Sequence, residues 1–151
     1  MSDPIIKSVV VNARPDRAFD VFVHRIADWW PLDGHAVSAS QGQPALAVVI
    51  EPRVGGAVYE TMFDGARTDW GEVLAFEEGR SLAFSWHPGA NKDRSTRVEV
   101  EFQALGADQT KVTLTHRGWE IWAAEATDKR TGYDSGWDHV LAECYRRAVA
   151  Y

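Results

Sequence analysis

Two stretches in the second half of the chain, residues 96–102 and 111–116, alternate apolar and polar side chains almost without exception. This pattern constrains the fold more than any other feature, because successive side chains of an extended chain point to opposite faces of a sheet. Each stretch therefore predicts a strand with one buried and one hydrated face, as antiparallel sheets have. The positions on the buried face are Val98, Val100, Phe102, Val112, Leu114 and His116.

Turn signals divide much of the remaining chain into further short strands. Asp64-Gly65 predicts a hairpin, and Gly55-Gly56 opens the strand before it. The strands predicted in this way cover residues 5–12, 45–50, 57–62, 68–76 and 81–86.

Two segments have the three- and four-residue spacing of an amphipathic helix. The first begins at Pro15, a residue tolerated in the first turn of a helix, and ends at Pro31. The second runs from about residue 127 or 133 to the end of the chain, a length of roughly 28 Å for its last nineteen residues. Gly136 in its first turns predicts that another group approaches the helix closely. The apolar stripe of this helix consists of Tyr133, Trp137, Val140, Leu141, Cys144, Ala148 and Tyr151.

The order of these elements, strand, helix, about six strands and long helix, predicts one α+β domain over residues 1–151. The terminal helix is the only element long enough to cover the buried face of the sheet. We therefore expect the sheet to curve around this helix.

The composition disfavours several classes of function. A formal net charge of −6 without a concentrated basic patch argues against nucleic acid as a partner. No apolar run approaches the roughly 18 residues of a membrane span, and the N-terminus lacks a signal-peptide pattern, which together predict a cytoplasmic protein. Cys144 is the only cysteine and is expected as a small buried side chain, while the five histidines lack metal-ligand spacing. We expect no metal and no cofactor, since phosphate-binding loop motifs are also absent.

Blocks along nearly the whole chain are similar to one known family. They include Trp29-Trp30-Pro31 and Tyr133-Asp134-Ser135-Gly136-Trp137, and the others lie at residues 18–19, 51–56, 70–73, 82–86, 96–100 and 116–120. The set resembles the helix-grip superfamily of START-domain and birch-pollen-allergen-like proteins (SRPBCC). Within it, the chain is most similar to the family named after the C-terminal domain of the heat-shock-protein-90 ATPase activator. The resemblance implies a helix-grip fold of six to seven antiparallel strands wrapped around a long C-terminal helix, with a pocket but no shared catalytic motif.

Seven tryptophans in one chain suit either a bulky aromatic core or the wall of an apolar binding site. Trp29 and Trp30 are expected to cap the core at the end of the first helix. We predict that Trp70, Trp86, Trp119 and Trp137 help to bind a hydrophobic or aromatic small molecule between the sheet and the terminal helix. The residues expected to contact it are Trp70, Phe84, Trp86, Phe102, Leu114, His116, Trp119, Tyr133, Trp137, Val140 and Leu141.

Three polar residues leave an enzymatic alternative open. His116 continues an apolar row, either as a hydrogen-bonded core residue or as a proton donor and acceptor in the cavity. Glu60 and Glu72 alternate in step with apolar neighbours and would face inward, unless a bulge beside Gly71 turns both toward solvent. A cyclase- or hydratase-like enzyme would use His116 with Glu60 or Glu72 as acid and base.

A third possibility is a co-chaperone-like domain that binds a chaperone through its surface. The sequence leaves open whether the chain is a monomer or a dimer, which an exposed edge strand at residues 45–50 could join.

Overall fold

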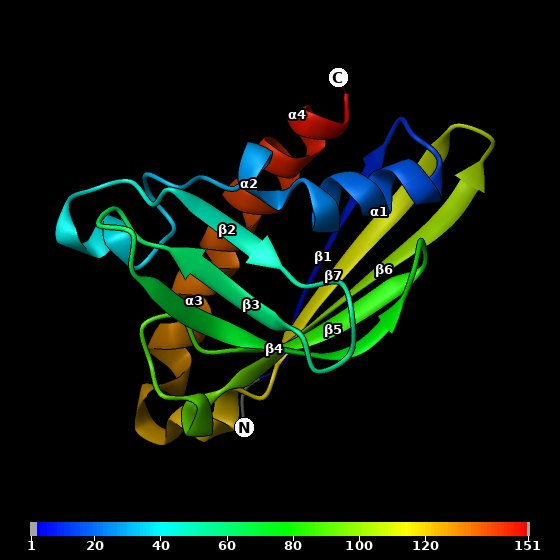
Figure 1. The fold of residues 1–151 in the computed structure, drawn as a ribbon. Coiled ribbons are helices and arrows are strands. Elements are labelled where there is room, and N and C mark those ends of the chain that lie inside the picture. The colour runs from blue at the N-terminus through cyan, green and yellow to red at the C-terminus, as the bar shows by residue number, and fades with distance from the viewer. Residues whose placement is uncertain (1–2, 151) are drawn as a thin grey trace.

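Seven antiparallel strands form one curved sheet in the computed structural model, which describes residues 3–150 (Figure 1). The strand order across the sheet is β1-β7-β6-β5-β4-β3-β2. Each predicted strand is present, with ends that differ by a few residues. The strands are β1 (Ile5–Val11), β2 (Ala47–Ile50), β3 (Ala57–Thr61), β4 (Arg67–Glu77), β5 (Ser81–Trp86), β6 (Thr96–Gly106) and β7 (Gln109–Arg117).

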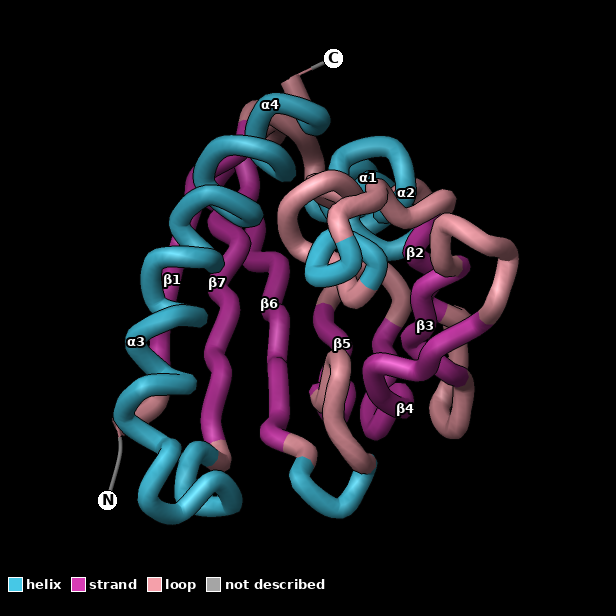
Figure 2. The backbone as a smooth tube through the Cα atoms, turned by 90° about the vertical axis from the view of Figure 1, so that its left-hand side faces the viewer, coloured by secondary structure: helices cyan, strands magenta, loops and turns pink. Residues whose placement is uncertain are grey.

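The C-terminal helix runs along β1 and β7 and is gripped by the curved sheet (Figure 2). It consists of α3 (Ala126–Trp137), a π-helical segment η4 (Asp138–Tyr145) and α4 (Arg146–Val149). Lys7 of β1 ties the helix to the sheet edge, with its Nζ 2.9 Å from Asp134 and 3.0 Å from Asp138. This arrangement confirms the predicted α+β helix-grip fold.

The shorter helices fill the connections between these elements. Two of them, α1 (Pro15–His24) and α2 (Ile26–Trp29), form the predicted first helical segment and lie near the C-terminal end of the long helix (Figure 1). The remaining ones are η1 (Ser38–Gln41), η2 (Lys92–Arg94) and η3 (Trp119–Glu125).

The predicted apolar stripe of the terminal helix is wrong beyond Leu141, because the helix contains the π-helical segment η4. A π-helix has more residues per turn than an α-helix, so the buried face moves along the sequence. Beyond Leu141 the buried positions are Tyr145 and Val149, whereas Cys144 and Ala148 are only half-buried. Tyr151, the last predicted member of the stripe, lies outside the described residues.

A bulge in β4 decides which way the acidic residues face. The pairing of β3 with β4 shifts between Val58 and Tyr59, so that Trp70 and Gly71 are both buried. The backbone of β5 passes so close that a Cβ built on Gly71 would collide with the Ser85 carbonyl oxygen. The expected bulge therefore turns Glu72 toward solvent, whereas Glu60 stays on the inner face and is fully buried.

Candidate functional site

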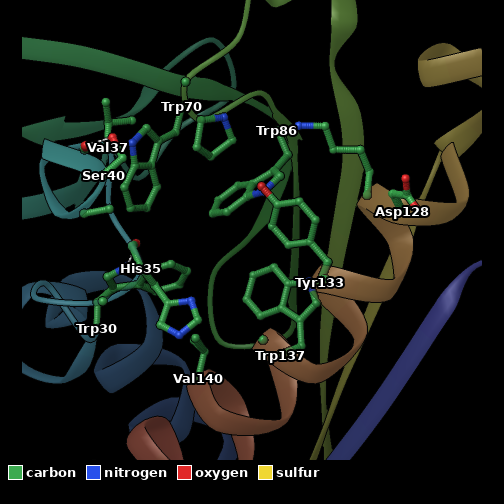
Figure 3. A pocket seen from close by; sticks show the side chains of 17 residues that line it. Trp30, His35, Val37, Ser40, Trp70, Trp86, Asp128, Tyr133, Trp137 and Val140 are labelled. Atoms are coloured by element: carbon green, nitrogen blue, oxygen red, sulfur yellow. Dashed lines mark hydrogen bonds between the residues drawn. The ribbon is translucent and has the colours of Figure 1, made fainter. Parts of the chain in front are cut away.

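A cavity of about 560 Å³ opens at the end of the sheet away from α1 (Figure 3). Three segments surround its mouth: residues 31–46, which we call the rim loop, the turn at Pro88 and Gly89, and the first turns of α3. Its floor is almost entirely aromatic. The floor residues are Trp30, Trp70, Trp86, Tyr133, Trp137 and Val140.

The tryptophan rings of the floor touch one another and form a continuous surface. The ring centroid of Trp30 lies 5.3 Å from that of Trp70 and 5.9 Å from those of Trp86 and Trp137. Trp86 in turn lies 5.4 Å from Trp70 and 5.6 Å from Trp137. Such tilted contacts between neighbouring rings are favourable. They bury most of each ring, and the four indoles are only 1–7% exposed at the base of the cavity.

Hydrogen bonds hold three of these indoles in place. Trp30 donates to the His35 carbonyl oxygen at 2.7 Å, and Trp70 donates to the Glu60 carboxylate at 3.1 Å. Trp137 Nε1 donates to His116 Nδ1 at 3.0 Å. Because these three rings are anchored at their polar atoms, they hold most of the floor in a fixed arrangement.

Glu60 connects the floor to the rim loop. Besides the Trp70 indole, its carboxylate accepts hydrogen bonds from the backbone N–H groups of Val37 at 2.7 Å and Ser38 at 2.9 Å. The Ser38 hydroxyl donates a further bond at 2.6 Å. A buried carboxylate needs such partners, and here they make Glu60 a positioning residue for the mouth of the cavity.

His116 lies behind the floor and is fully buried. Burial lowers its pKa to about 3, so the imidazole is neutral near pH 7. Its Nδ1 accepts from Trp137, so Nε2 carries the proton of the neutral ring and faces the Thr96 hydroxyl oxygen at 2.6 Å. Both ring nitrogens are therefore engaged in supporting the floor.

The structure brings part of the predicted binding set to the cavity. Trp70, Trp86, Tyr133, Trp137 and Val140 line it. The other predicted contacts are packed in the core and do not line it, namely Phe84, Phe102, Leu114, His116, Trp119 and Leu141.

The filling of the core around Phe102 has a clear cause. The ring of Phe102 lies 5.1 Å from Phe19 and 5.8 Å from Phe22, both of which come from α1. This helix occupies the space that the sequence assigned to a ligand. The cavity is therefore confined to the opposite end of the sheet.

Sequence reasoning missed several residues at the mouth. Trp30, expected only to cap the core, forms part of the floor, and His35 of the rim loop stands beside α3. A Cβ built on Gly136 would lie 3.6 Å from His35 Cε1, so the rim loop is the group that approaches the helix there. The signal that could have located the mouth is the spacing of Gly132 and Gly136, which puts two glycines on one face of α3.

Two kinds of feature are absent from residues 3–150. No helix in this range is long and apolar enough to span a membrane. Among the same residues, no group of three His, Cys, Asp or Glu side chains is arranged to hold a metal ion.

Fold and cavity together define a helix-grip domain with an aromatic cleft at one end. The family model described as "Activator of Hsp90 ATPase homolog 1-like protein" matches residues 12–145. The chain belongs to this family, which confirms the resemblance drawn from its sequence blocks. The comparison with curated proteins gave no match.

Solved structures with the same fold include proteins of several kinds. The anthrahydroquino-γ-pyrone synthase Txn09 is 31% identical, with 88% of each chain covered and a TM-score of 0.60. The self-sacrificing resistance protein CalC from Micromonospora echinospora is 22% identical over 97% of this chain and 93% of its own, with a TM-score of 0.69. Protein MLL2253 from Mesorhizobium loti is 15% identical over 97% and 96% of the two chains, with a TM-score of 0.71.

Proposed function

We propose that the protein binds a flat, hydrophobic or aromatic small molecule in the cleft between the rim loop, β4–β5 and α3. The observation that carries this proposal is the aromatic floor, in which four tryptophans and Tyr133 meet at the base of an open cavity of about 560 Å³. Binding sites for small molecules are usually concave, mostly apolar and preformed, with few polar groups. An aromatic floor of this kind favours a ligand that can stack on it or meet its ring edges.

Of the three structures described above, the one with the highest sequence identity supports the same ligand class. Txn09 is named as an anthrahydroquino-γ-pyrone synthase, which indicates that a related fold acts on a fused aromatic compound. For this chain we infer the ligand class from that similarity and from the floor. The reaction of Txn09 is not carried over to this chain.

The geometry favours binding over the acid–base mechanism considered from the sequence. His116 is buried behind Trp137 with both nitrogens engaged, and Glu60 is surrounded by hydrogen-bond donors. Glu72 lies on the exposed face of β4. None of the three lines the cleft, so they do not form an acid–base pair around a bound molecule. The cytoplasmic location, the chaperone partner and the monomer-or-dimer alternative remain predictions.

A cleft-filling variant tests the proposal. Gly132 lines the cleft, and no atom lies within 4 Å of a Cβ built on it, so the helix can carry a side chain there and Gly132→Leu places an isobutyl group at the cleft. Thr131→Leu adds a similar side chain at the exposed neighbouring position and is the matched control. With 9-fluorenone as a planar three-ring probe, calorimetry should show saturable binding that Gly132→Leu weakens at least tenfold and Thr131→Leu leaves unchanged. Absence of saturable binding, or equal affinity in the two variants, would contradict the proposal.

A further inference from the structure

One indole of the floor differs from the other three in its hydrogen bonding. Trp86 is 5% exposed, yet its Nε1–H has no hydrogen-bond partner among the described residues. It is the one buried side-chain polar atom in residues 3–150 without a partner. A buried donor left unpaired costs about 1–3 kcal/mol, and buried indole N–H groups usually find an acceptor.

The hydroxyl of Tyr133 lies beside this indole. Figure 3 shows the Tyr133 ring extending from α3 toward Trp86, with its oxygen next to the indole. Burial raises the pKa of Tyr133, and the neighbouring Trp86 N–H offsets part of that rise. The two groups are close without hydrogen-bond geometry. Because burial raises the pKa of the phenol, Tyr133 keeps its proton at neutral pH and remains a donor.

Both residues line the cleft and come from opposite walls, with Trp86 Nε1 itself shielded from solvent beside the Tyr133 side chain. Trp86 ends β5 and Tyr133 lies on α3, and both line the cavity. An N–H and an O–H that stand side by side can donate to one oxygen atom placed between them. A hydrocarbon would leave both donors unpaired when it displaces water from the cleft.

We propose that Trp86 Nε1–H and the Tyr133 hydroxyl form a two-donor site for an acceptor oxygen, a ring carbonyl or a phenolate, on the aromatic ligand. The inference rests on the proposed function and deepens it, because it selects oxygenated ring systems over hydrocarbons of the same shape. The tryptophan floor supplies affinity for the ring system, and the donor pair sets its orientation.

The test compares two probes that differ at one position. 9-Fluorenone carries a carbonyl where fluorene carries a methylene group, and the two ring frames are otherwise alike. Dissociation constants for both are measured with the wild type, Tyr133→Phe and Tyr59→Phe. Tyr133→Phe removes one donor and keeps the ring, whereas Tyr59 lies outside the cleft with its ring against Arg67 and serves as the control.

We expect the ratio of the fluorene to the fluorenone dissociation constant to fall about fivefold in Tyr133→Phe, which corresponds to roughly 1 kcal/mol. Tyr59→Phe should leave the ratio unchanged. The infrared C=O stretch of bound fluorenone should move to lower frequency in the wild type, and less so in Tyr133→Phe. Equal ratios in all three proteins together with an unshifted C=O band would overturn the donor site while leaving the cleft a binding site. Failure of both probes to bind would overturn both proposals.

Discussion

The interface between the sheet and the C-terminal helix has a filled half and an open half, and aromatic side chains build both. In the filled half α1 covers the sheet, and its aromatic rings pack on Phe102. The Tyr145 hydroxyl there donates to the Ala18 carbonyl oxygen at 2.7 Å, which joins the long helix to α1. In the open half the rim loop, which contains only the short helix η1 and is held by Glu60, stands in place of a long helix, and the tryptophan floor lines a cavity.

Because both halves are rich in aromatic residues, aromatic content does not distinguish a core from a binding site. What distinguishes them is the element that covers the rings. A helix brings a dense row of apolar side chains, whereas the rim loop brings small and polar residues at its tip.

The largest effect is expected at Gly71, next to Trp70 of the floor in β4. Gly71 has no room for a Cβ, because the Ser85 carbonyl oxygen occupies the position. We expect Gly71→Ala to lower the free energy of unfolding by at least about 3 kcal/mol, since a clash with backbone cannot relax through a rotamer change. Urea unfolding measures it, and an unchanged midpoint would show that β4 and β5 are farther apart than described.

Removing the charge of Glu60 should loosen the open half. Glu60→Gln replaces one acceptor oxygen by an NH₂ group that meets N–H donors, which we expect to cost about 2–3 kcal/mol. Hydrogen exchange at Val37 or Ser38 should become faster, because one of the two N–H groups loses its acceptor oxygen and faces an NH₂ group. Glu72→Gln, on the exposed face of β4, is the matched control and should change neither quantity. Equal behaviour of the two variants would refute the anchoring role of Glu60.

Acidification should destabilise the protein through His116, which lies behind the tryptophan floor. Burial lowers the pKa of His116 from 6.5 to about 3 in the folded protein. Between these pH values the imidazole is protonated in the unfolded chain and neutral in the folded one. The free energy of unfolding therefore decreases as the pH falls below 6.5. His116 accounts for a decrease of about 2 kcal/mol between pH 7 and pH 5. Urea unfolding at the two pH values should show this loss in the wild type and a loss smaller by that amount in His116→Gln. Identical pH dependence in both proteins would contradict the neutral, buried imidazole.

The smallest effect concerns the helix face at the mouth. Gly132 stands in α3 with open space around it, so Gly132→Ala should stabilise the protein by up to about 1 kcal/mol through helix propensity. Thermal unfolding gives the comparison with the wild type. A loss of stability would show that the glycine is needed for packing and does not merely keep the cleft open.

Most of the fold was predictable because its signals are local. Alternation in β6 and β7 and the glycine turns gave the strands, and the spacing of apolar residues gave both helical segments. The part that failed depends on contacts between distant segments. The π-helical segment buries Tyr145 in place of Cys144, and no local pattern distinguishes it from a continuous α-helix.

The candidate site was only partly predictable for the same reason. Trp86, Tyr133 and Trp137 could be assigned to one region from their order along the chain. The sequence does not give the angle at which α1 packs on the sheet. It therefore could not predict that α1 fills the space beside Phe102. The role of Glu60 likewise depends on its hydrogen bond with Ser38 of the rim loop, which is 22 residues away in sequence.

The indole N–H signals of the tryptophans give the most direct test of the central claim, that the aromatic cleft is the binding site. In ¹H–¹⁵N spectra recorded during titration with 9-fluorenone, the signals of Trp30, Trp70, Trp86 and Trp137 should shift and saturate together. Those of Trp29 and Trp119, which donate to backbone carbonyl oxygens within the core, should stay in place. Unmoved signals for the four cleft indoles, or equal shifts at Trp29 and Trp119, would contradict the account.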